Sequence, residues 1–222
     1  MSRKPGDGKL RRAHLERLMH YYHFVSERIA QHTSHAVSSA ELASVLNMDD
    51  TQVRKDLAAI GVQGYPRVGF KCAEIAQAVR GVLGFGQTSK AILVGAGRLG
   101  GAMAAYRGFS QYGMTIVALF DADLNRVGSV VGGHVVQPIQ SLEMAIRRHG
   151  VRLAILTVPA EAAQELADRL VATGIRAIWN FAPTGLTVPS GVFVRHELIS
   201  VGLAELSYFL KGTEGEDDTH GA

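Results

Sequence analysis

Apolar positions in the N-terminal third of the chain recur at helical spacing. From about residue 10 to residue 30 they fall at steps of three and four, which predicts an amphipathic helix. The segment SSAELASVL that follows opens on a Ser-x-x-Glu capping box, a common start of a short helix. The next segment, DDTQVRKDLAAIG, offers Asp49 or Asp50 as N-cap and Gly61 as its stop. The pattern therefore predicts one long helix followed by two short ones.

Two short helices joined by a tight turn are typical of a helix-turn-helix DNA reader, in which the second helix enters the major groove. The Gly-rich segment VQGYPRVGF that follows favours a β-hairpin wing. A three-helix bundle with a solvated charged face is the alternative. On the helix-turn-helix interpretation we assign DNA contacts to Ser38, Ser39, Thr51, Gln52, Arg54, Lys55 and, in the wing, Arg67.

The pattern changes near residue 86. The segment KCAEIAQAVRGVLG predicts a linker helix that leads into a Gly-rich hinge. Beyond it the apolar runs AILVGA, TIVALFD, LAILTVP and AIWNFAP alternate with helical segments. This alternation is typical of a parallel sheet wrapped by helices. The expected fold class is therefore α/β: a winged helix-turn-helix domain over residues 1–86 and a Rossmann-type, doubly wound parallel sheet from residue 87.

Charge supports this division. Residues 1–72 carry 11 Lys and Arg against 7 Asp and Glu, whereas the remainder holds 12 against 13. This asymmetry suggests a polyanionic partner for the N-terminal domain. The sequence has no apolar run of membrane-spanning length and no signal peptide pattern, so we expect a cytoplasmic protein. The lone Cys72 is expected to be a packing residue, and the charged tail over 212–222 to be disordered.

One motif indicates a ligand. The sequence KAILVGAGRLGGAMA places three glycines at GxGxxG spacing between a strand and a helix. The first permits a tight turn, the second lets the backbone approach a pyrophosphate, and the third allows close packing of helix on strand. The helix N-terminus adds free N–H groups. We therefore expect the cofactor loop to comprise Gly95, Ala96, Gly97, Arg98, Leu99 and Gly100.

The residue at the end of the next strand indicates which cofactor is favoured. The strand ends in Asp121, placed to accept hydrogen bonds from ribose hydroxyls and to repel a 2′-phosphate, which favours NAD over NADP. Arg126 leaves NADP open as an alternative. Two later strand ends fall at the same edge of the sheet and are candidates for the nicotinamide half, although proline-set strand stops explain them equally well. They comprise Thr157, Val158, Pro159, Asn180 and Phe181.

The sequence offers little for catalysis. No acid or base is evident beside the predicted hydride acceptor, and the residues after the boundary suffice for the nucleotide fold alone. The histidine spacings match no closed metal site, so we expect none. A small NAD-dependent oxidoreductase with a helical extension remains an alternative. A nucleotide-binding module of the CoA-ligase type is a second, disfavoured by Asp121 and by the helix-turn-helix.

Several motifs in one order carry a resemblance: SSAELA, QVRKDL, LVGAGRLG, YRGF, FDAD, TVP, NFAP and LSYFL. From about residue 10 to residue 210 the chain resembles the Rex redox-sensing repressors of bacteria. The resemblance implies a homodimer that binds palindromic operator DNA when NAD is abundant and leaves it when NADH binds. It implies that the helix over 197–211 swaps onto the partner and that Tyr106 lies near the nicotinamide. It places dimer contacts at Arg11, Glu197, Tyr208 and Phe209.

The chain departs from the family pattern in three places. Arg98 replaces an asparagine in the glycine loop and adds a cation near the phosphates. The wing has Gly64-Tyr65-Pro66-Arg67 where the family has Gly-Lys-Arg-Gly, so it carries one cation in place of two. A lost phosphate contact weakens DNA binding and flattens its salt dependence. Glu197 stands where an aspartate is usual, which alters the geometry of the implied salt bridge with Arg11.

Overall fold

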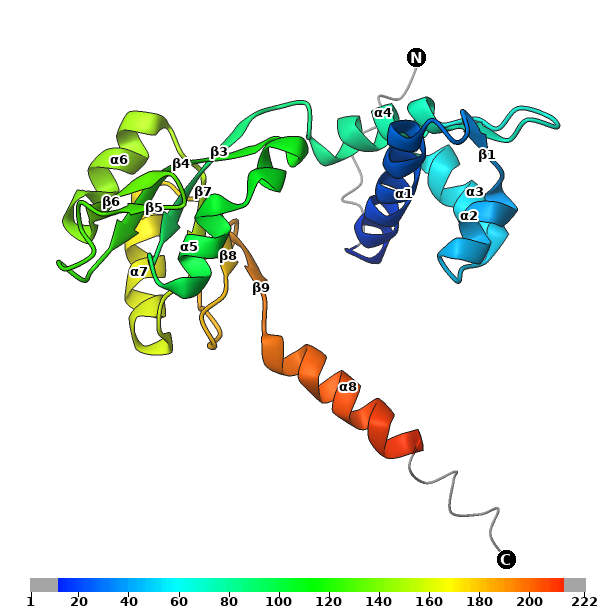
Figure 1. Ribbon diagram of the computed structural model, residues 1–222. Coiled ribbons are helices and arrows are strands. Elements are labelled where there is room, and N and C mark those ends of the chain that lie inside the picture. The colour runs from blue at the N-terminus through cyan, green and yellow to red at the C-terminus, as the bar shows by residue number, and fades with distance from the viewer. Residues whose placement is uncertain (1–11, 214–222) are drawn as a thin grey trace, which may run out of the picture. The chain divides into compact units, whose positions relative to one another are not determined.

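The computed structural model describes residues 12–213, so the predicted dimer residue Arg11 and residues 214–222 of the predicted tail lie outside it. The chain folds as two compact units that divide after Gln87, each with its own hydrophobic core (Figure 1). Among the described residues no helix is long and apolar enough to cross a membrane.

The N-terminal unit is a small helical domain. Ser38 caps one helix by accepting a hydrogen bond from the Glu41 N–H at 3.0 Å, and Asp49 caps the next by accepting from the Gln52 N–H at 3.1 Å. These contacts confirm Ser38 as an N-cap and select Asp49 as the second one, whereas the Glu41 carboxylate pairs with Arg28 and does not complete the capping box. The helices are α1 (Arg12–Gln31), α2 (Ser39–Val45), α3 (Asp50–Ala59) and α4 (Cys72–Leu83), and β1 (Ala36–Val37) pairs antiparallel with β2 (Phe70–Lys71).

The predicted wing is present between α3 and β2. Tyr65 and Gly69 form an antiparallel bridge, and their backbones exchange hydrogen bonds of 2.7 and 2.9 Å. Gly69 has a φ of +89°, and a Cβ there would lie 2.5 Å from the carbonyl oxygen of Val37, so only glycine fits. Arg67 lies between the bridged residues with a φ of 62° and is exposed. The wing therefore presents a cation at its turn.

The C-terminal unit is built on a seven-stranded sheet in the order β5-β6-β4-β3-β7-β8-β9, parallel except for β5. Its strands are β3 (Ser89–Val94), β4 (Met114–Asp121), β5 (Val130–Val131), β6 (His134–Pro138), β7 (Leu153–Leu156), β8 (Ala177–Asn180) and β9 (Phe193–His196). The helices are α5 (Arg98–Ala105), α6 (Leu142–His149), α7 (Ala160–Thr173) and α8 (Ile199–Thr213), with short 3-10 turns η1 (Arg107–Tyr112) and η2 (Ile139–Ser141).

The central strands are buried on both faces. Ile92 and Val94 pack with residues of α6 and α7, whereas Ala91 and Leu93 face Met103 of α5. This accounts for the continuous apolar runs in the sequence and confirms the predicted α/β class. The β5–β6 hairpin and β9 were not predicted, because they are short strands at the two ends of the sheet order with only partial burial.

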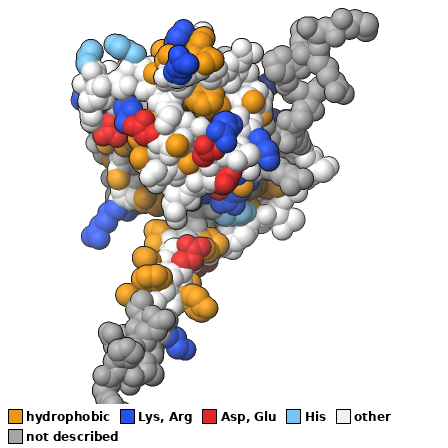
Figure 2. Space-filling model, turned by 90° about the vertical axis from the view of Figure 1, so that its right-hand side faces the viewer, with side chains coloured by type: hydrophobic (Ala, Val, Ile, Leu, Met, Phe, Trp, Pro, Cys, Tyr) orange, Lys and Arg blue, Asp and Glu red, His pale blue; other side chains and the backbone are white. Residues whose placement is uncertain are grey.

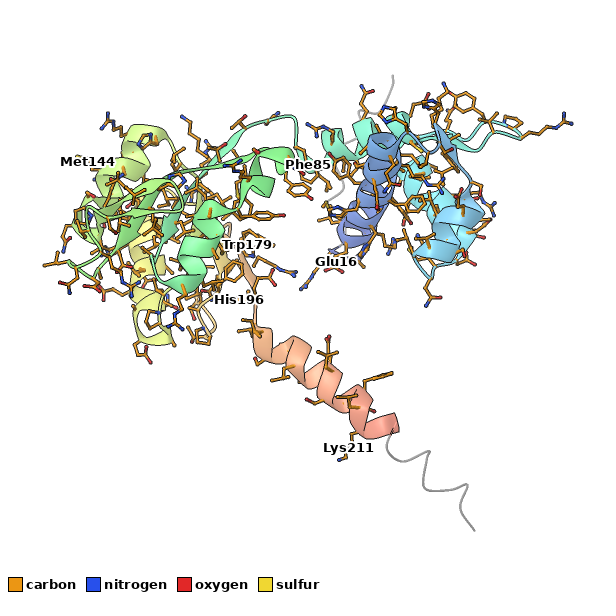
Figure 3. All side chains as sticks on the ribbon, in the orientation of Figure 1. Glu16, Phe85, Met144, Trp179, His196 and Lys211 are labelled. Carbon is orange, nitrogen blue, oxygen red and sulfur yellow. The ribbon has the colours of Figure 1, made fainter. Side chains whose placement is uncertain are left out.

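The C-terminal helix α8 presents apolar side chains without cover from the described residues. It begins at Ile199 and extends to Thr213, so it starts two residues later and ends two residues later than predicted. Every side chain from Leu198 to Lys211 is exposed. Figure 2 shows the apolar side chains along this helix, and Figure 3 labels Lys211 near its end. A helix of this composition is stable in water only when another surface covers it.

Candidate functional site: a dinucleotide pocket and a DNA-reading helix

The turn between β3 and α5 is built for close backbone approach. Gly95 has a φ of +103°, and a Cβ there would lie 2.5 Å from the carbonyl oxygen of Thr157. A Cβ on Gly100 would lie 1.8 Å from the carbonyl oxygen of Gly95, so helix and strand meet where no side chain fits. The Thr157 hydroxyl donates to the same oxygen at 2.8 Å. These contacts fix the conformation of the turn, and the N-terminus of α5 faces the pocket.

Asp121 reaches back from the end of β4 to this turn. One of its carboxylate oxygens accepts from the Ala96 N–H at 2.7 Å, and the other accepts from the Asp123 N–H at 2.8 Å. Arg126 lies near both carboxylates, 3.7 Å from Asp121 and 3.3 Å from Asp123. The Asp121 carboxylate, which would meet a ribose, is therefore held in place by two backbone N–H donors, and Arg126 lies beside it.

These residues line a pocket of about 700 Å³. Of the predicted cofactor residues it brings together Gly95, Gly97, Arg98, Leu99, Asp121, Thr157, Val158, Pro159 and Phe181. Ala96, Gly100, Asn180 and Tyr106 do not line it; the first two build the turn beneath it. The sequence-based analysis missed further lining residues on η2 and α7, which no local motif marks: Ile139, Ala162, Glu165, Leu166 and Arg169.

In this structure the Asn180 side chain bonds to neighbouring parts of the chain. It is fully buried, and its amide nitrogen donates to the Thr184 carbonyl at 2.8 Å. Its amide oxygen accepts from the Ala182 N–H at 3.1 Å, and the His196 ring nitrogen lies 3.1 Å from the amide (Figure 3). Asn180 thus shapes the chain that follows β8. Its chain neighbour Phe181 does line the pocket.

A line of aromatic rings extends from Phe181 across the sheet. Trp179 on β8 lies 5.0 Å from Phe181 and 6.0 Å from Phe109, and Phe109 lies 5.0 Å from Tyr106, all between ring centroids. The Trp179 indole also donates to the Glu197 carboxylate at 3.2 Å (Figure 3). Tyr106 itself is 56% exposed. Trp179 therefore connects Phe181 of the pocket wall with Glu197, two residues before the start of α8.

The second candidate site lies on α3. Arg54 pairs with Asp50 at 2.5 Å and donates to the Ser39 hydroxyl at 3.5 Å, which ties the starts of α2 and α3 together. Thr51 and Lys55 are exposed beside Arg54. Among the predicted DNA contacts Gln52 differs, because its side chain is half-buried and donates to Asp56 at 2.8 Å. In this structure the Gln52 side chain is therefore engaged with Asp56 of the same helix.

Asp56 is the buried acceptor of a hydrogen-bond network that the sequence did not predict. It is 3% exposed and accepts two hydrogen bonds from Arg17 of α1, at 2.5 and 2.9 Å. The Tyr21 hydroxyl donates to it at 3.0 Å, in addition to Gln52. Burial alone would raise the pKa of Asp56, but the hydrogen bonds from Arg17, Gln52 and Tyr21 outweigh it and hold this pKa below its ordinary value. α3 is thus anchored to α1 by an ion pair whose carboxylate is buried.

The Asp56→Ala substitution is expected to destabilise the N-terminal unit by about 3 kcal/mol at pH 7, because it leaves Arg17 unpaired. Since folding lowers the pKa of Asp56, its contribution is complete at neutral pH. It is lost as the pH falls from the ordinary aspartate value of about 3.9 through the lower folded value. Hydrogen exchange of the α1 and α3 amides measures this opening.

The matched control is Asp50→Ala on the same helix. Its pair with Arg54 is more exposed, so the cost should stay below about 1 kcal/mol. Equal protection of the α1 amides in Asp56→Ala and in the unmodified protein would contradict the anchoring role of Asp56.

Other candidate chemistry in the described residues is weak. No group of three His, Cys, Asp or Glu side chains there is arranged to hold a metal ion. Cys72 is fully buried, and burial raises the pKa of its thiol, which disfavours the reactive thiolate. Its environment is that of a packing residue.

Comparison with known proteins agrees with both halves of this description. A family model described as "CoA binding domain" matches residues 86–184, and one described as "Putative DNA-binding protein N-terminus" matches residues 10–58. A DNA-reading helix and a nucleotide pocket on one chain define the class of ligand-responsive transcription regulators.

Proteins similar in sequence and in structure show to which family the chain belongs. The chain is 42% identical over 175 residues to the redox-sensing transcriptional repressor Rex of Roseiflexus sp. (strain RS-1), covering 79% of this chain and 80% of that protein. The crystal structure of RSP in complex with beta-NAD+ and operator DNA matches with a TM-score of 0.87, 31% identity and coverage of 96% and 97%. That of RSP in complex with beta-NADH has a TM-score of 0.85, 31% identity and coverage of 96% and 99%.

The chain belongs to the Rex family of redox-sensing transcriptional repressors. Its relatives are regulators and not enzymes, which sets aside the oxidoreductase alternative.

Proposed function

We propose that this protein binds NAD(H) in the pocket at the carboxyl ends of β3, β4 and β7, and that it leaves its operator DNA when the pocket holds NADH. The observation that carries the proposal is the open glycine turn with Asp121 beside it, in one pocket and on one chain with a helix-turn-helix. Support comes from the RSP structures, one of which is a complex with NAD+ and operator DNA and the other a complex with NADH. Release requires the NADH-bound protein to favour a conformation with lower DNA affinity.

The residues around the pocket fit a dinucleotide. The N–H groups at the start of α5 and the exposed Arg98 offer donors and positive charge for a pyrophosphate. Asp121 would accept from a ribose hydroxyl and would oppose a 2′-phosphate, which favours NAD over NADP. Thr157, Pro159 and Phe181 would hold the nicotinamide end. The proximity of Tyr106 and Asn180 to that end remains a prediction.

The Asp121→Ala substitution is expected to weaken NADH binding about tenfold, since it removes a charged acceptor and frees the Ala96 N–H that organises the turn. Fluorescence titration of NADH measures the affinity. The control is Asp168→Ala on α7, whose side chain is exposed and outside the pocket lining, and which should bind NADH normally. Unchanged affinity in Asp121→Ala would remove this residue from the proposed site.

For the DNA half we propose that α3 enters the major groove, with Thr51, Arg54 and Lys55 toward the operator and Arg67 of the wing on the backbone. These four side chains are exposed and three lie on one short helix. Ser38 and Ser39 at the start of α2 are placed for phosphate contacts, as helix N-termini commonly are. Gln52 would need to leave Asp56 to read a base.

The Arg54→Ala substitution is expected to lower operator affinity at least about tenfold, the cost of one lost bidentate base contact. NADH affinity should not change, because Arg54 belongs to the other compact unit. A gel shift at fixed salt measures the first quantity and NADH fluorescence the second. The matched control is Arg12→Ala, which removes one exposed cation from α1. Full operator binding by Arg54→Ala would contradict the recognition-helix assignment.

We further propose that two chains form a homodimer in which α8 swaps onto the partner, so that two recognition helices meet a palindromic operator. The exposed apolar side chains of α8, including Tyr208 at 82% and Phe209 at 67%, support this. Glu197 precedes the helix and accepts from Trp179 and Arg195, so it would set where α8 leaves the sheet.

A transcription regulator acts where the DNA lies, which in a bacterium is the cytoplasm.

A further inference from the structure

Three neighbouring strands of the sheet have a cation at or immediately before their amino ends. Ala91, Leu153 and Ala177 are aligned across β3, β7 and β8, so the residues that precede them form one row. Adjacent strands lie about 4.8 Å apart, which places the backbones of the outer two about 10 Å apart. We call Lys90, Arg152 and Arg176 the amino-edge row, and it lies at the opposite edge of the sheet from the dinucleotide pocket.

The amino-edge row lines a hollow of about 520 Å³. Thr88, Ser89 and His149 complete its polar lining. No described carboxylate forms an ion pair with any of the three cations, and Lys90 donates only a long hydrogen bond, 3.4 Å, to the His149 carbonyl. The hollow therefore collects donors and positive charge without a negative group among the described residues.

Helix electrostatics favours positive charge both at the end of α6 and in the amino-edge row. Arg147, Arg148 and His149 lie in the last turn of α6, where positive charge offsets the negative end of the helix dipole. Arg152 and Arg176 each lie three residues past the end of α6 or α7, and Lys90 donates to the last carbonyl of α6, so the negative ends of these helices also favour the row. Like charges this close repel one another, and a multiply charged anion would remove that repulsion.

We propose that the amino-edge row is a second ligand site, for the phosphates of a multiply charged phosphate compound. Arginine guanidinium groups bind phosphate oxygens with paired hydrogen bonds, and Lys90 adds a point charge. The hydroxyls of Thr88 and Ser89 are additional donors. The phosphates can belong to a free polyphosphate or to a DNA backbone. The site does not depend on the proposed NAD(H) function.

The test is a calorimetric titration of inorganic tripolyphosphate into the full-length protein, at low ionic strength and with NADH present in excess so that the dinucleotide pocket is filled. We expect saturable binding of one equivalent per chain. Arg152→Ala/Arg176→Ala should weaken it at least about tenfold, since two charge-assisted donors are lost. The matched control, Arg147→Ala/Arg148→Ala, removes the same charge outside the hollow and should bind normally.

A second arm separates the two sources of phosphate. If the row contacts DNA, Arg152→Ala/Arg176→Ala should flatten the salt dependence of binding to a long operator fragment by about two phosphate contacts, and the control should not. Weak tripolyphosphate binding with this flattened slope would assign the phosphates to DNA. Equal effects of the two double variants, or no effect in either arm, would overturn the proposal. The first arm requires no DNA binding, so its failure is distinct from failure of the proposed function.

Discussion

The Gly100→Ala substitution is expected to abolish NADH binding at concentrations that saturate the unmodified protein. The new Cβ would lie 1.8 Å from the Gly95 carbonyl oxygen and 2.7 Å from the Thr157 hydroxyl. Gly95 cannot easily yield, because its N–H donates to the Phe120 carbonyl at 2.8 Å. Relief therefore requires α5 to move off the strand and the turn to open. Overpacking costs up to about 3 kcal/mol, roughly a hundredfold in affinity.

Fluorescence titration of NADH measures this loss, and circular dichroism checks that the variant is folded. The matched control is Gly81→Ala inside α4, where an added Cβ meets nothing within 4 Å. That variant should bind NADH normally and gain about 0.5–1 kcal/mol of stability. Normal NADH affinity in Gly100→Ala would show that the turn between β3 and α5 is not the cofactor site.

The triple substitution Leu203→Asp/Leu206→Asp/Leu210→Asp is expected to leave the protein monomeric and unable to hold its operator. These side chains repeat at helical spacing on α8 and are 64%, 65% and 60% exposed. Covered by a partner chain, each would contribute about 2 kcal/mol of apolar burial, and a carboxylate there would be costly to bury. Sedimentation velocity measures the mass, and a gel shift measures operator binding.

The matched control places three aspartates on another side of the same helix. Ser200→Asp/Ala204→Asp/Ser207→Asp adds the same charge about 65° to 130° around the helix from the mean direction of the three leucines and should remain dimeric. If the leucine variant sediments as the same species as the unmodified protein, α8 does not carry the dimer interface. In that case its apolar face would have another partner.

Local sequence signals were enough to predict much of the fold and the pocket. The N-cap at Ser38 and the glycine turn at Gly95 depend on residues a few positions apart, and both are present. The apolar runs mark the buried central strands because those strands are covered on both faces. Asp121 could be placed because the end of the second strand meets the first turn in any fold of this kind.

What the sequence did not reveal depends on contacts between distant residues. Asp56 looks like one more exposed charge in a polar helix, and only the approach of Arg17 from α1 explains its burial. Asn180 resembles a pocket residue, yet its amide is used by the chain that follows it and by His196 of β9. The link between Trp179 and Glu197 likewise joins elements that no motif connects.

Release of operator DNA by NADH tests most directly whether one chain couples the two sites. In a gel-shift titration at fixed salt, the protein should retain a promoter-derived fragment with NAD present and lose it as NADH is added. Fluorescence of bound NADH in the same samples reports occupancy of the pocket. Loss of DNA that follows this occupancy is the expected result, and full DNA retention with the pocket saturated by NADH would contradict it.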